Sequence, residues 1–139
     1  MRAASHAVAE ALFSTEQGPP PPERLAWLVD DLDDFVARAG ARARLVYLLC
    51  LVALTFAAPL LIGRLSPIHR LSATDRMEAL TRAERGAMGM AVFGAKALLS
   101  ILYYEHADAA RAVGFDGACL LEPAPVAETQ KRRAPEAPA

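Results

Sequence analysis

The stretch "LVYLLCLVALTFAAPLLIG", residues 45–63, decides how the rest of this chain of 139 residues is interpreted. It contains no charged residue and is long enough to form a transmembrane helix. Pro59 argues against a membrane span because proline disturbs a helix, and arginines on both flanks give no orientation. Two interpretations therefore stay open: a buried central helix of a helical domain, or a helix that enters or lies on a membrane.

The composition points to apolar surface beyond the needs of an ordinary small domain. Hydrophobic residues make up 54% of the chain and the mean hydropathy is +0.21, whereas about 45–50% apolar residues is usual. The excess must be buried in a core, a membrane or a partner. The formal net charge of −1 gives no reason to expect a nucleic-acid partner.

The N-terminal residues do not have the pattern of an export signal. His6, Glu10 and Glu16 interrupt any apolar core that a signal peptide would need. We therefore expect a protein of the cytoplasm, or one peripheral to the inner membrane. Cys50 and Cys119 form no CxxC motif, so neither a zinc ribbon nor a redox pair is expected.

Helical periodicity is the main structural signal before the apolar stretch. Residues 2–15 predict a short helix with a modest apolar face, and the "GPPPP" at 18–22 ends it. Residues 22–39 predict an amphipathic helix with apolar side chains at three- and four-residue steps. Its acidic residues, Asp30, Asp31, Asp33 and Asp34, lack the spacing of an EF-hand and are interpreted as a solvated face.

The second half of the chain continues the helical pattern. Ser72 or Thr74 can cap a helix that runs to about residue 85, and an apolar helix follows over 86–105. A short helix is expected at 106–114, and the Pro/Ala/charged composition of 122–139 predicts a disordered or extended tail. The prediction is an all-α fold: a small bundle of about five helices over residues 1–121, followed by a tail over 122–139.

No catalytic or metal-binding constellation is evident. His6, His69 and His106 lie on separate predicted elements, and Glu105 and His106 would diverge by about 100° on a helix. The residues favour a non-enzymatic interaction protein without a metal or cofactor of its own. A helical enzyme that uses Glu105, His106 or Lys96 is the weaker alternative.

The stretch "LLSILYYEHADAARAVGFDG" at 98–117 resembles the helical N-terminal region of bacterial glucose-methanol-choline (GMC) flavin oxidoreductases. It is also similar to small subunits of the gluconate 2-dehydrogenase subunit 3 type. The segments "PLLIGRLSPIHRLS" (59–72) and "LSATDRMEALTRAERG" (71–86) resemble the preceding parts of the same region. In the family this region leads into a flavin domain, which the present sequence lacks after Gly117.

The resemblance implies a non-catalytic accessory subunit that binds and stabilises a separately encoded, FAD-containing GMC oxidoreductase acting on an alcohol, sugar or sterol. The expected partner-binding residues are Tyr103, Tyr104, Phe115, Asp116 and Gly117. The alternative is a single-pass or monotopic membrane anchor that uses residues 45–63 and recruits a partner enzyme through its amphipathic helices.

Overall fold

The computed structural model describes residues 1–115, which are helical and contain no named strand, in agreement with the predicted all-α fold. Met1–His106 form one compact unit, whereas α7 (Ala107–Ala112) belongs to a second unit and is described separately. The predicted domain end at residue 121 and the predicted tail at 122–139 lie outside the described residues. The elements of the first unit are α1 (Arg2–Phe13), α2 (Pro22–Arg38), α3 (Ala41–Val52), the π-helical turn η1 (Ala53–Ala57), α4 (Ala58–Leu60), the 3-10 turn η2 (Ile68–Arg70), α5 (Ala73–Arg85) and α6 (Gly89–Glu105).

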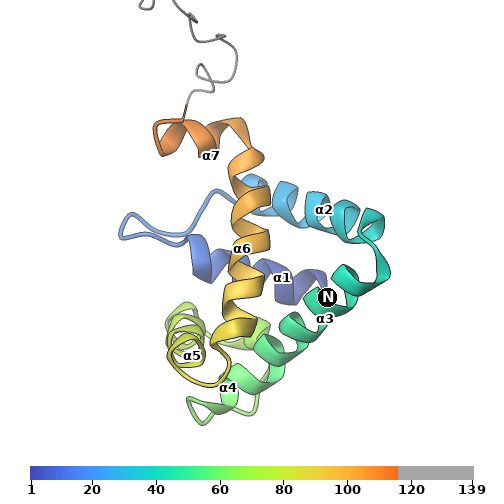
Figure 1. The fold of residues 1–139 in the computed structure, drawn as a ribbon. Helices are drawn as coiled ribbons and strands as arrows, with labels where there is room; N and C mark the ends of the chain where they lie inside the picture. Colours follow the sequence, from blue (N-terminus) through green and yellow to red (C-terminus); the bar gives the residue numbers. More distant parts are fainter. Residues whose placement is uncertain (116–139) are drawn as a thin grey trace, which may run out of the picture. The chain divides into compact units, whose positions relative to one another are not determined.

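The buried helix of the bundle is α1, which packs against α2, α5 and η2 (Figure 1). Its buried side chains are small: Ala4, Ser5, Ala7, Val8, Ala9 and Ala11. Small side chains let neighbouring helices approach closely, so α1 is enclosed although its sequence is only moderately apolar. Helix Ala41–Leu60 is less enclosed than α1, since a third of it is buried. Whether residues 45–63 form a core helix or a membrane helix therefore stays open.

The amphipathic helix predicted at 22–39 is α2, which begins with Pro22 in its first turn. Leu25, Leu28, Val29, Leu32 and Val36 are buried, as their spacing predicted, while Phe35 is 41% exposed. Arg2 of α1 forms exposed ion pairs with Asp30 and Asp33. The acidic run is thus a mainly solvated face that also ties the start of α1 to α2.

Helix Ala41–Leu60 continues through α3, η1 and α4 without a break in the chain of helical turns. The wide turn η1 ends two residues before Pro59, whose ring would clash with the carbonyl one turn earlier in a regular α-helix. The Thr55 hydroxyl donates a hydrogen bond to the Leu51 carbonyl, with 2.6 Å between the oxygens. Proline therefore widens this helix locally but does not end it.

The connection to the last long helix is fixed by a cap and by ion pairs. Of the two candidate caps, Ser72 is the one used, since its hydroxyl accepts a hydrogen bond from the Asp75 amide at 3.1 Å. Arg76 of α5 donates to the Glu10 carboxylate of α1 at 2.8 Å. The chain then turns into α6, which packs against α2, α3 and α5 and buries Val92, Ala95, Leu99, Leu102 and Tyr103.

Candidate interaction site

The helix Ala41–Leu60 has one face on the bundle and one apolar face in solvent. Tyr47, Leu51, Leu54, Thr55, Ala58 and Pro59 are buried. On the other side five apolar residues, each 54–60% exposed, recur at three- and four-residue steps: Leu45, Leu49, Val52, Phe56 and Leu60. We call this surface the α3–α4 stripe. Tyr47 and Thr55 of the same helix are buried, and the five residues of the stripe are all apolar.

Tyr47 holds this helix on α1. Its hydroxyl lies 2.9 Å from the Ser5 hydroxyl, and both residues are buried. Burial raises the pKa of the Tyr47 phenol above its ordinary value of 10.0, and the hydrogen bond with Ser5 opposes part of that effect. The pair therefore favours the neutral phenol and fixes which face of α3 points to the core.

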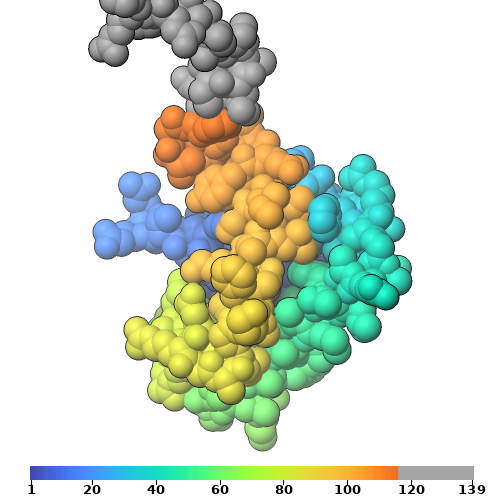
Figure 2. Space-filling model, in the orientation of Figure 1, coloured from blue at the N-terminus to red at the C-terminus, as the bar shows by residue number. Residues whose placement is uncertain are grey.

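A second apolar surface lies on α6, which crosses the front of the bundle in Figure 2. Met90, Phe93 and Ile101 are 78%, 66% and 62% exposed, and Tyr104 continues the same helix face. We call Met90, Phe93, Ile101 and Tyr104 the α6 stripe. The sequence predicted an apolar helix here, but only the structure shows which of its residues are left uncovered.

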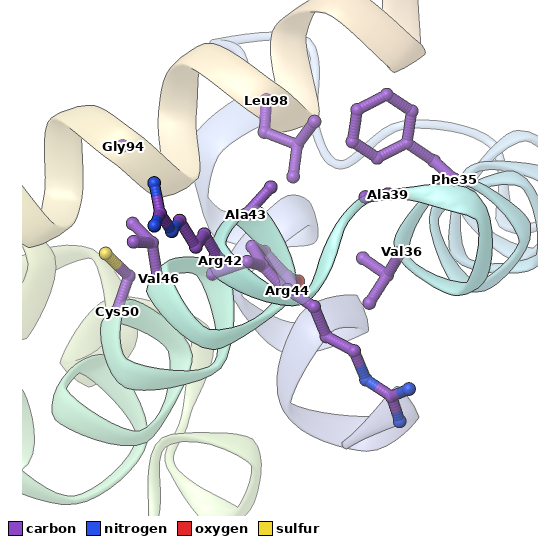
Figure 3. A pocket seen from close by; sticks show the side chains of 11 residues that line it. Phe35, Val36, Ala39, Arg42, Ala43, Arg44, Val46, Cys50, Gly94 and Leu98 are labelled. Carbon is purple, nitrogen blue, oxygen red and sulfur yellow. The ribbon is translucent and has the colours of Figure 1, made fainter.

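An apolar groove of about 350 Å³ lies where α2, α3 and α6 meet. Phe35 of α2 and Leu98 of α6 lie close together in it, and Arg42 and Arg44 of α3 are also among its lining residues, with side chains that point in different directions (Figure 3). The α3 and α6 backbones approach closely at Gly94, where an added Cβ would lie 3.5 Å from the Cys50 sulfur. The groove is large enough to accept an apolar side chain of a partner.

The two adjacent tyrosines at the end of α6 have different environments. Tyr103 is buried, its ring stacks on Phe13 at a centroid distance of 4.0 Å, and its hydroxyl accepts a hydrogen bond from Arg24 at 3.1 Å. Tyr104 is partly exposed and meets Tyr103 edge-to-face at 5.3 Å. Adjacent residues on a helix point about 100° apart, which explains why one ring is buried and the other is partly exposed. Tyr103 is therefore enclosed in the bundle, whereas Tyr104 is accessible to solvent, and the role of both as partner-binding residues stays a prediction.

The other predicted partner-binding residues lie beyond this unit. Phe115 is 47% exposed and belongs to the second unit, while Asp116 and Gly117 lie outside the described residues. Their role as partner-binding residues stays a prediction. The exposed α6 residues were missed at the sequence level, although the spacing of Met90, Phe93 and Ile101 could have identified them as one helix face.

The side chains considered for catalysis have structural contacts. The Lys96 ammonium lies 3.5 Å from the Glu84 carboxylate in an exposed ion pair, and the His106 ring packs edge-to-face on Trp27 at 5.0 Å. His106 follows the last residue of α6 in an extended conformation, so it does not share a helix with Glu105. Within residues 1–115, no group of three or more His, Cys, Asp or Glu side chains is arranged to hold a metal ion.

By length and composition, Ala41–Leu60 is apolar enough to cross a membrane. The bent pair α5 and α6 passes the same test only when the two helices are taken together. However, α5, which packs on α4, carries charged side chains: Arg82 donates to the Leu61 carbonyl at 2.8 Å while pairing with Glu78. A charged residue at the centre of a bilayer costs about 2.5–3.5 kcal/mol on insertion scales. A span by this helix would carry charged neighbours into hydrocarbon unless the helix left the bundle.

No protein-family model, no curated protein and no solved structure matches the chain. The structure itself defines the described part of the chain as a helical bundle with two exposed apolar stripes and an apolar groove.

Proposed function

We propose that this chain is a non-catalytic accessory subunit that docks on a separately encoded, FAD-dependent oxidoreductase of the GMC type through the α6 stripe. The observation that carries the proposal is the exposure of Met90, Phe93 and Ile101 along one face of a helix whose opposite face is buried in the bundle. Single exposed apolar residues are normal on protein surfaces, but a contiguous apolar patch is typical of an interaction site.

Two features support a protein partner at this surface. The groove between α2, α3 and α6 can receive an apolar anchor residue, the kind of contact that contributes most to protein–protein affinity. Tyr104 closes the C-terminal end of the stripe and adds an amphipathic ring, a residue type enriched in interfaces. The identity of the partner rests on the resemblance of residues 59–72, 71–86 and 98–117 to the family's helical region.

Purification of the tagged chain from its native host tests the proposal. We expect a larger subunit with a flavin absorption spectrum to co-purify. The variant Met90→Glu/Phe93→Glu should lose this subunit because charge is placed in the docking surface. The matched control is Met77→Glu on α5, where the methionine is also exposed but lies outside the stripe. A colourless chain without a large companion would overturn the proposal.

Membrane association is the second candidate function, and it is favoured by the α3–α4 stripe. The helix Ala41–Leu60 has 20 residues and a mean hydropathy of 2.0, but only a third of it is buried in the bundle. A core helix of a soluble domain would be mostly enclosed. Alkaline carbonate extraction of native membranes distinguishes an integral anchor from peripheral attachment. Retention of the chain in the membrane indicates an integral anchor, and release excludes one.

A further inference from the structure

We propose that helix Ala41–Leu60 lies flat in the interface of an anionic lipid bilayer, with the α3–α4 stripe in the acyl boundary and its flanking arginines among the phosphates. This rests on the second candidate function and commits it to one geometry and one lipid chemistry. It does not involve the α6 stripe, so the docking of a protein partner stands or falls separately.

The first argument is the one-sided packing of this helix. Leu45, Val52 and Leu60 mark the solvent side over its whole length, while Tyr47 and Leu51 are held against the bundle. A spanning helix needs apolar surroundings on every side, whereas a helix in the interface needs them on one. The folded bundle supplies this second arrangement without any helix having to leave it.

The second argument is the charge of the segment. Between Gly40 and Thr74 the chain has arginines at positions 42, 44, 64 and 70 and no aspartate or glutamate. Arg64 pairs with Asp75 at 3.2 Å, whereas Arg42, Arg44 and Arg70 have no ion pair with any residue of the described part of the chain. In a protein with a net charge of −1, the segment that carries the apolar stripe thus has arginines without any acidic residue between them.

The placement of these arginines at both ends of the helix distinguishes the two membrane geometries. A spanning helix is oriented by an excess of basic residues on one side, which is not found here. A helix parallel to the membrane holds both ends at the same depth, where arginines at either end meet anionic headgroups. Leu61 and Leu65, which are 43% and 95% exposed, extend the apolar surface beyond α4 toward Arg64.

Vesicle flotation with the full-length chain tests lipid binding. We expect binding to vesicles of phosphatidylcholine with phosphatidylglycerol to exceed binding to phosphatidylcholine alone by roughly 100-fold, because each of the three unpaired arginines contributes about fivefold near an anionic surface. Leu49→Glu/Phe56→Glu should abolish flotation. Met90→Glu/Phe93→Glu is the matched control and should float like the natural chain. All three proteins should have the same circular dichroism spectrum, since the substituted residues are exposed.

Depth measurements test the geometry. Single-cysteine variants Leu45→Cys, Val52→Cys and Leu60→Cys, in a Cys50→Ala/Cys119→Ala background, would carry a fluorophore quenched by brominated lipids. A helix in the plane gives the same depth at all three positions, whereas a spanning helix gives its greatest depth at residue 52. Graded depths would therefore overturn the proposed geometry.

Two further outcomes would overturn the proposal. One is the absence of flotation with either vesicle, or flotation that Leu49→Glu/Phe56→Glu leaves unchanged. The other is that the natural chain does not bind vesicles, and that Leu49→Glu/Phe56→Glu loses a protein that co-purifies with the natural chain. That result would assign the α3–α4 stripe to a protein partner. Loss of the flavoprotein in Met90→Glu/Phe93→Glu alone concerns the proposed function and leaves the membrane proposal intact.

Discussion

The two faces of helix Ala41–Leu60 can be tested with the same substitution at two nearby positions. Leu49 is 60% exposed and Leu51 is 3% exposed. Truncation of a buried leucine to alanine removes about 2–5 kcal/mol from the free energy of unfolding. We therefore expect Leu51→Ala to lose an amount in this range.

The expected loss at Leu49 is much smaller. Complete burial of a leucine side chain contributes roughly 1.5–3 kcal/mol, and most of Leu49 remains in water after folding. Alanine also has the higher helix propensity by a few tenths of a kcal/mol, which offsets part of the lost contact. Leu49→Ala should therefore lower the free energy of unfolding by less than about 1 kcal/mol.

Denaturant unfolding followed by far-ultraviolet circular dichroism measures both values, because the described unit is almost entirely helical. A loss of 1 kcal/mol also shifts Tm by several degrees in a domain of this size. Equal losses in Leu49→Ala and Leu51→Ala would refute the one-sided packing of the helix. A larger loss in Leu49→Ala would mean that the stripe faces the core.

Two further predictions concern α6 and the buried tyrosine. Gly94→Ala should raise the free energy of unfolding by up to about 1 kcal/mol, since the new Cβ meets only the Cys50 sulfur at 3.5 Å. Gly89→Ala should lower it by about 1–3 kcal/mol, because its Cβ would lie 2.8 Å from a backbone oxygen. Thermal unfolding of the two variants measures both changes, and changes of the same sign would contradict this packing. The raised pKa of Tyr47 predicts that stability falls as pH rises above about 10, because the unfolded state loses its phenolic proton first. The unfolding free energy measured against pH should fall less steeply in Ser5→Ala/Tyr47→Phe, and an unchanged slope would exclude this cause.

Much of the secondary structure follows from local pattern. The apolar spacing in α2 predicted its buried residues, the "GPPPP" at 18–22 predicted the break before it, and Ser72 was one of two candidate caps for α5. Propensity, capping and the period of a helix depend on residues within a few positions of each other. Such features can be derived from one sequence without a tertiary structure.

The choice of the buried helix could not be derived in this way. Residues 45–63 are far more apolar than the alanine-rich α1, so hydropathy does not identify α1 as the more enclosed helix. Burial depends on how closely helices can approach, and small side chains such as Ala7 and Ala9 allow contact from several sides. The bulky residues of helix Ala41–Leu60 are then too many for one packing face, and a third of the helix is buried.

For the candidate site, too, some features follow from the sequence and others only from the tertiary structure. The sequence determined an all-α protein with more apolar residues than a small domain buries, and placed basic residues at both ends of its most apolar helix. Only the tertiary structure decided that Tyr103 packs on Phe13, and that the unburied residues form two stripes on α6 and on α3–α4. The physical reason is that a helix is apolar by composition, but the side that remains in solvent is set by neighbours that are distant in the chain.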